Sequence, residues 1–183
     1  MDFALTRPEI DGQRLALLGR SFGGYLAPRG ATAEHRIAAL VCDPGQVDLG
    51  ARVKKSVPAP ALDLIRSNDP RVDDLIAPMM DSPQARRTWR PRMAAHGTPT
   101  FREYLRTLLD FTLEDRAADI TCPTLVTEGE GDFAGGQTQR LYELLACPKA
   151  YRAFTQAEGT SGTWKGSASR CGTAMSSTGS MRP

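Results

Sequence analysis

The sequence predicts an α/β protein with a parallel sheet and a helical insertion. Short apolar runs alternate with helix-like segments in the first and last parts of the chain, and a proline-divided stretch with helical spacing lies between them. A chain of 183 residues is long enough for a sizeable core. The expected organisation is a core region over 1–52, a helical insertion over 53–119, the rest of the core over 120–159, and a disordered tail over 160–183.

The first strands and the helix between them follow from two apolar runs. Residues 14–18 lie between glycines and predict a strand that is buried on both faces of a parallel sheet. Residues 22–36 predict a helix, although Pro28 weakens its middle. Residues 37–42 predict a second buried strand. A β-α-β alternation therefore begins near the amino terminus.

The middle of the chain has many prolines, which divide it into short helical segments. Its most amphipathic piece is 101–111, where one face has the spacing of a helix. That face consists of Phe101, Tyr104, Leu105, Leu108 and Leu109. We expect it to pack in a core; lining a substrate pocket is the alternative.

The last part of the chain predicts two more strands and a helix. Residues 122–127 form the third expected strand, 135–145 a helix, and 151–154 a weaker fourth strand. Residues 160–183 contain no Leu, Ile, Val, Asp or Glu, so this tail is not expected to form a packed helix.

Composition narrows the class of protein. The formal charge of +2 comes from interleaved acidic and basic residues, which gives no basic stripe for nucleic acid. No apolar run approaches the length of a membrane span. The four cysteines lack CxxC spacing and the amino terminus has no export signal, which favours free thiols in the cytoplasm. A small molecule is the expected partner.

The stretch GRSFGG suggests a nucleophile. Gly19-x-Ser21-x-Gly23 follows a predicted strand and precedes a predicted helix, which is the context of a nucleophile elbow. Such a turn needs small neighbours and exposes the serine hydroxyl. The backbone N–H of Phe22 would then form half of an oxyanion hole. The alternative is an ordinary glycine-rich turn.

Five stretches together resemble a known family: LLGRSFGGYLAPR, EHRIAALVCDPG, MMDSPQARRTWRPRMAAHGTPTFREYLRTLLDFTL, ITCPTLVTEGEGD and CPKAYRAFTQAEG. From about Asp2 to Gly162 the chain is similar to α/β-hydrolases of the esterase and dipeptidyl-aminopeptidase-like branch, the group of 2,6-dihydroxypseudooxynicotine hydrolase. The resemblance implies a partial α/β-hydrolase fold with a helical cap. It also implies an acyl-enzyme reaction on esters, amides or activated C–C bonds, without metal or organic cofactor.

By this resemblance Ser21 matches the nucleophile and Asp132 matches the acid of a catalytic triad. Asp132 follows the third predicted strand, and the order Ser, Asp, His is the one such hydrolases use. Three other carboxylates compete with it. Glu128 and Glu130 lie on the same loop, and Asp43 ends the preceding strand.

The triad base has no obvious candidate, because the chain contains only His35 and His96. His35 is expected to face solvent or to interact with a helix dipole, and His96 to have a structural or capping role. In the resembling family the histidine comes a few residues beyond a motif like Ala157-Glu158-Gly159. At that place this chain has Thr-Ser-Gly-Thr-Trp, residues 160–164.

The tail composition suggests a frame shift after Gly162. If one base is restored, codons allowed for Thr163-Trp164 become His-Leu, and WKGSASRCGTAMSSTGSM can become LEGLGQQVWHGHVFDWLD. We therefore expect that a single-base deletion or a sequencing error removed the triad histidine and a final helix. A natural flexible tail is the alternative.

The front of the chain is also short for such a hydrolase. Met1 lies only 20 residues before Ser21, whereas the family places several strands and the second oxyanion donor there. An exposed apolar edge is therefore expected beside residues 14–18. The alternative function is a non-catalytic fragment or pseudogene product. A nucleotide-binding protein is disfavoured, because neither G-x-G-x-x-G nor G-x-x-x-x-G-K-[ST] follows a strand.

Overall fold

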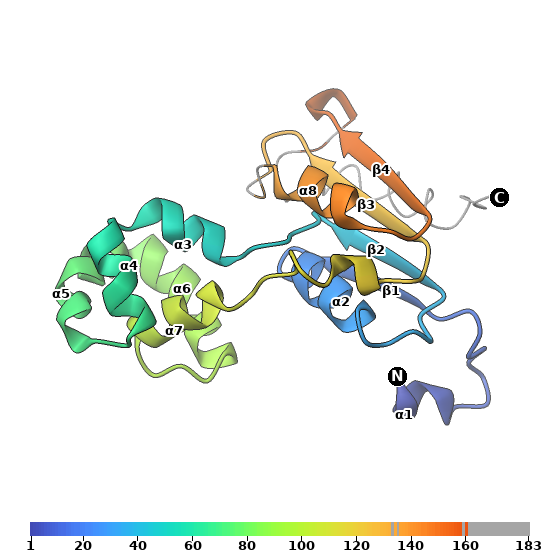
Figure 1. The fold of residues 1–183 in the computed structure, drawn as a ribbon, viewed down its shortest axis with the longest axis horizontal. Coiled ribbons are helices and arrows are strands. Elements are labelled where there is room, and N and C mark those ends of the chain that lie inside the picture. The colour runs from blue at the N-terminus through green and yellow to red at the C-terminus, as the bar shows by residue number, and fades with distance from the viewer. Residues whose placement is uncertain (133, 135, 159, 161–183) are drawn as a thin grey trace. The chain divides into compact units, whose positions relative to one another are not determined.

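The chain divides into two compact units in a computed structural model that describes residues 1–132, 134, 136–158 and 160 (Figure 1). The sheet unit is formed by residues 1–47 and the described residues from 113 onward, and the helical unit by 48–112. Asp48 and Thr112 form an isolated antiparallel bridge, and the Leu113 N–H donates to the Val47 carbonyl at 2.9 Å. The helical unit is thus a closed insertion whose two ends meet, a few residues earlier at each end than the expected 53–119.

The sheet unit contains four parallel strands in the order β1-β2-β3-β4, which confirms the predicted α/β class. These are β1 (Ala16–Arg20), β2 (Ala39–Asp43), β3 (Thr124–Gly129) and β4 (Lys149–Phe154). The first three begin and end later than predicted. The apolar run shows where a strand is buried, but the backbone ladder continues to polar residues such as Arg20 and Asp43 at the carboxyl edge.

The prediction that the first strand is buried on both faces is wrong. Leu17 is 36% exposed and Leu18 is 59% exposed, on opposite faces of β1. The physical reason is that β1 pairs only with β2 among the described residues, so it lies at an edge of the sheet. The apolar edge expected beside this strand is present.

Helices cover one face of the sheet (Figure 1). Helix α2 (Gly23–Ala31) packs on β1 and β2, α8 (Gln137–Leu144) packs on β3 and β4, and the short η3 (Ala117–Asp119) contacts both helices. The core under them includes Tyr25, Ile37, Leu40, Cys42, Val47, Leu113, Ile120, Val126 and Leu141. Outside this layer lie α1 (Asp2–Leu5) and η4 (Gln156–Glu158).

Helix α2 runs through Pro28 and ends at Ala31, earlier than the predicted 36. Proline has no N–H, so the Gly24 carbonyl four residues earlier lacks its helical donor. The Gln46 N–H, on the loop after β2, donates to that carbonyl at 3.2 Å. A tertiary hydrogen bond therefore compensates for the proline.

The helical unit consists of seven short elements. They are α3 (Gly50–Ser56), α4 (Ala59–Arg66), η1 (Pro70–Val72), α5 (Asp73–Ile76), η2 (Ala77–Met80), α6 (Pro83–Ala95) and α7 (Phe101–Leu109). Local signals fix some of their starts: Ser82 caps α6, and Thr100 with Glu103 forms a capping box at α7.

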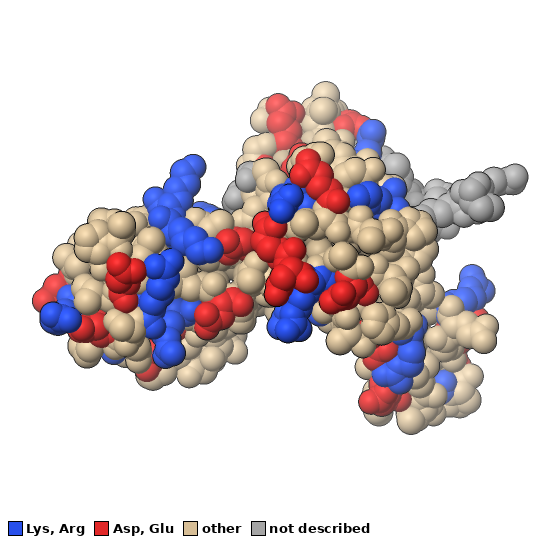
Figure 2. Space-filling model, in the orientation of Figure 1, with Lys and Arg blue, Asp and Glu red and all other residues tan. Residues whose placement is uncertain are grey.

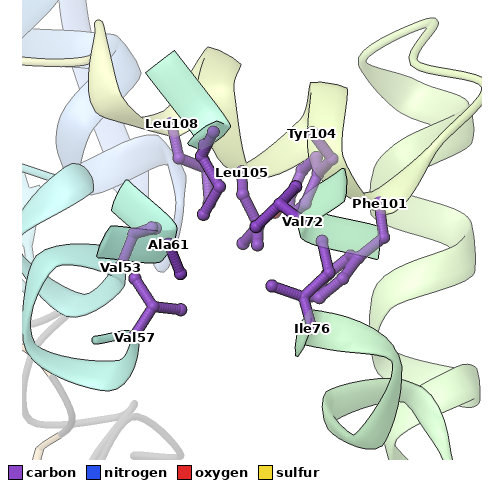
Figure 3. Packing of buried hydrophobic residues seen from close by; sticks show 10 residues of the cluster. Val53, Val57, Ala61, Val72, Ile76, Phe101, Tyr104, Leu105 and Leu108 are labelled. Atoms are coloured by element: carbon purple, nitrogen blue, oxygen red, sulfur yellow. The ribbon is translucent and has the colours of Figure 1, made fainter. Parts of the chain in front are cut away.

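The apolar face predicted for 101–111 packs in the core of the helical unit (Figure 3). Phe101, Tyr104, Leu105 and Leu108 of α7 are buried there, and Leu109 is partly buried. They meet Val53, Val57, Ala61, Ile65, Val72 and Ile76 from the preceding elements. Core packing is thus the observed use of this face.

Charges of both signs are mixed on the face of the molecule seen in Figure 2. Figure 2 shows Lys and Arg side chains interspersed with Asp and Glu on the visible face. In the described part of the chain, no helix combines the length and the apolar character needed to cross a membrane.

Candidate active site

Ser21 occupies a sharp turn between a strand and a helix. It directly follows β1, and its φ of +56° lies in the left-handed region that L-residues seldom adopt. The Ser21 N–H donates to the Asp43 carbonyl at 2.7 Å, and its own carbonyl accepts from the Gly24 N–H at 2.8 Å. The residue is partly exposed. The turn thus holds a serine at the carboxyl edge of the sheet, in strained backbone.

The glycines around Ser21 have different roles. A Cβ on Gly19 would lie 2.0 Å from the Gly23 carbonyl oxygen and 2.5 Å from the Ala27 Cβ, so only glycine fits between strand and helix. A Cβ on Gly24 would lie 1.8 Å from the Pro44 oxygen. A Cβ on Gly23 would meet no atom of the described chain within 4 Å. The sequence motif includes Gly23, but close approach requires Gly19 and Gly24.

Phe22 follows Ser21 and immediately precedes α2. Its carbonyl accepts from the N–H groups of Tyr25 and Leu26 at 3.0 and 3.2 Å, which starts the helix. The N–H of Phe22 therefore belongs to the positive end of the nine-residue α2, the end that favours developing negative charge.

Asp132 lies just beyond β3 at the same edge of the sheet as Ser21, because both follow the carboxyl ends of parallel strands. Their strands are separated by β2, so two strand spacings amount to about 10 Å. The Asp132 N–H donates to the Gly129 carbonyl at 2.9 Å, and Oδ1 accepts from the Ala134 N–H at 3.3 Å. Ser21 and Asp132 thus lie at one edge of the sheet, after strands that β2 separates.

Asp43 is the competing carboxylate nearest to the elbow. It ends β2, directly beside β1, and its Oδ1 accepts from the Thr127 hydroxyl at 2.6 Å. Its backbone carbonyl also receives the Ser21 N–H. Asp43 therefore supports the turn through its backbone while its side chain is held by β3.

The other two competing carboxylates are directed toward β4. Glu130 Oε2 accepts from the Gln156 N–H at 2.8 Å. Glu128 accepts from the Tyr151 hydroxyl, and burial together with this carboxylate raises the pKa of Tyr151 to about 12. Both carboxylates thus have partners on the side of β3 away from β1.

His35 lies at the opposite edge of the sheet from Ser21. It precedes β2, and its Nδ1 is 3.2 Å from the hydroxyl of Thr121, which precedes β3. A five-residue strand separates the two edges by more than about 13 Å. In this fold His35 cannot receive a proton from Ser21.

His96 has a structural position in the helical unit. It is the C-cap residue of α6, and its ring packs edge-on against Tyr104 and beside Phe111, with centroid separations of 5.3 and 5.6 Å. This apolar environment lowers the pKa of His96 below its ordinary value.

Acid pH is therefore expected to destabilise the helical unit. In the unfolded chain His96 binds a proton more readily than in the folded chain, so its contribution is complete above about pH 6.5 and is lost as pH falls toward the lower folded pKa. Urea unfolding of the Trp164→Phe variant between pH 7.5 and 5.5, followed by the fluorescence of the remaining Trp89, measures this. His96→Gln should show a smaller loss than wild type; equal losses would contradict the assignment.

The segment where the sequence predicts a frame shift and a lost triad histidine lies outside the described residues. Gly162, Thr163 and the rest of the tail, where the frame-shift hypothesis falls, belong to 161–183. Among the described residues, no group of three or more His, Cys, Asp or Glu could hold a metal ion.

Gly24, Gln46 and Thr127 also take part in this edge of the sheet, and no local pattern in the sequence points to Gln46 or Thr127. Gln46 is buried, and its Nε2 donates to the Ser21 carbonyl at 2.5 Å. Only Gly24 carried a local signal, as the glycine directly after the motif. Gln46 and Thr127 lie 25 and 106 residues from Ser21 along the chain, so only the fold brings them near it.

The parallel sheet, with Ser21 in a left-handed turn between a strand and a helix, defines a class of α/β proteins. Within that class, the sequence profile of the Alpha/beta hydrolase family matches residues 2–161. The chain belongs to this family.

Individual relatives are similar over much of the chain. The alpha/beta hydrolase psoB of Aspergillus fumigatus is 30% identical over 158 residues, which cover 79% of this chain and 35% of psoB. The crystal structure of 2,6-dihydroxy-pseudo-oxynicotine hydrolase has a TM-score of 0.55 at 21% identity, covering 84% of this chain and 36% of that one. The alpha/beta hydrolase GrgF from Penicillium sp. sh18 has a TM-score of 0.63 at 16% identity, covering 96% and 66%. The chain thus spans about a third of the length of the first two relatives.

Proposed function

We propose that the chain is a serine hydrolase by lineage, with Ser21 as its nucleophile. The single observation that supports this most is the left-handed Ser21 directly after β1 and before α2. Such a turn lifts the hydroxyl away from the strand and places the following N–H groups at a helix start.

In the proposed reaction, Ser21 Oγ attacks a carbonyl carbon as its proton passes to a base. The Phe22 N–H stabilises the oxyanion, and Asp132 orients the base. The protonated base gives its proton to the leaving group, and water then releases the acyl group from Ser21. Esters, amides and activated C–C bonds all offer a carbonyl carbon with a leaving group. We propose a small molecule as the substrate.

Neither of the two histidines of this chain is placed to act as the base for Ser21. His35 lies at the wrong edge of the sheet, and His96 is packed among aromatic rings. Loss of a triad base lowers kcat by on the order of 10⁶. We therefore propose strongly impaired turnover, and the same observation favours a second candidate, a non-catalytic member of the family. The described cysteines are free thiols, which supports a cytoplasmic location.

Covalent labelling separates the two candidates. A fluorophosphonate probe with peptide mapping should label Ser21, and chromogenic-ester hydrolysis should rise when imidazole is added as an external base. Ser21→Ala should abolish both signals, whereas Ser67→Ala, which removes a serine hydroxyl from the helical unit, should leave them unchanged. Absence of labelling with and without imidazole would reject the hydrolase proposal for this chain.

A further inference from the structure

Gln46 makes two hydrogen bonds to the serine turn from another part of the chain. The residue is only 3% exposed, and its Nε2 donates to the Ser21 carbonyl at 2.5 Å. Its backbone N–H donates to the Gly24 carbonyl at 3.2 Å, the group that Pro28 leaves without a helical donor. Gln46 thus contacts the turn on both sides of Phe22.

The Ser21 carbonyl and the Phe22 N–H belong to the same peptide unit. A peptide bond is planar, and in the trans form its C=O and N–H point in opposite directions. A donor that fixes the carbonyl therefore also fixes the direction of the N–H. Gln46 and the Gly24 N–H both donate to this carbonyl, at 2.5 and 2.8 Å.

We propose that Gln46 is a positioning residue that aims the Phe22 N–H at the oxyanion of the reaction. The catalytic part of this inference rests on the proposed function. Its structural part, that Gln46 holds the Ser21–Phe22 peptide, stands independently. Loss of the Gln46 donor should free the peptide to rotate and leave a partly buried carbonyl with one donor fewer.

The neighbouring loop offers a matched control. Gln137 Oε1 accepts from the Val47 N–H at 2.9 Å, one residue after Gln46. A glutamate side chain accepts hydrogen bonds but donates none when ionised. Gln46→Glu therefore removes a required donor, whereas Gln137→Glu keeps a required acceptor. Gln46→Met removes the donor without burying a charge.

Residue-resolved amide hydrogen exchange tests the structural part. The Ser21 and Gly24 amides should exchange about tenfold faster or more in Gln46→Met and Gln46→Glu. The Leu40 and Thr124 amides, which bond to the carbonyls of Pro123 and Pro148, should keep their rates. Gln137→Glu should leave all four unchanged. At acid pH the introduced carboxyl group is protonated and can donate again, so Gln46→Glu should regain protection and Gln46→Met should not.

Three outcomes would overturn the inference: unchanged exchange in Gln46→Met, equal acceleration of all four amides, or the same effect in Gln137→Glu. A second experiment tests the catalytic part by comparing Gln46→Met with wild type. It measures fluorophosphonate labelling of Ser21 and ester hydrolysis in the presence of imidazole. Gln46→Met should lower the labelling rate and kcat about tenfold with KM nearly unchanged. A wild-type chain without labelling would reject the proposed function, while the exchange result would still decide whether Gln46 holds the turn.

Discussion

Replacing Gly19 with alanine is expected to destabilise the sheet unit by about 3 kcal/mol or more. The new Cβ would lie 2.0 Å from the Gly23 carbonyl oxygen and 2.5 Å from the Ala27 Cβ. Neither atom is the end of a flexible side chain, so strand β1 and helix α2 would have to separate. Urea unfolding followed by far-UV circular dichroism measures the loss in the free energy of unfolding. If the variant is partly unfolded, hydrogen exchange of the Leu40 amide should be faster than in wild type.

Gly23→Ala is the matched control for this prediction. An added Cβ would have no described atom within 4 Å, and the φ of Gly23 is not positive. Alanine is the better helix former at the first residue of α2, so stability should stay the same or rise by up to about 1 kcal/mol. Equal losses in the two variants would show that strand and helix do not approach at Gly19 as described.

Leu105→Ala is expected to destabilise the helical unit by about 3 kcal/mol. Leu105 is 2% exposed and lies in the cluster that α7 forms with α3, α4 and α5. Removing its branched end leaves a cavity among buried neighbours (Figure 3). In a Trp164→Phe background the remaining tryptophan is Trp89, whose ring packs against Phe101 and Tyr104 in this unit. Its fluorescence reports unfolding by urea.

Leu75→Ala provides the comparison, because Leu75 belongs to the same unit but is 60% exposed. The same atoms are removed, but no cavity is left. The free energy of unfolding should therefore change by no more than about 0.5 kcal/mol. A similar cost at both positions would mean that the apolar face of α7 is not the core of this unit.

Local patterns predicted most of the elements. The parallel sheet followed from apolar runs separated by helix-like segments, and the buried face of α7 followed from its spacing. The predicted ends of strands and helices were less accurate. Strand pairing extends beyond the apolar runs, and α2 ends at Ala31, earlier than predicted. The exposure of Leu17 and Leu18 departs from the pattern, since a run of apolar residues does not reveal whether a strand has one neighbour or two.

The sequence by itself determined the α/β class, the serine between strand and helix, and the scarcity of histidine, because each depends on residue type and short spacing. Only the tertiary structure decided that His35 lies at the far edge, that Asp43 is held by Thr127, and that Gly24 rather than Gly23 is closely packed. It alone brought Gln46 to the Ser21 carbonyl. These facts depend on which strand ends meet across the sheet, and contacts between distant segments are set by packing and strand order, which no short stretch of sequence encodes.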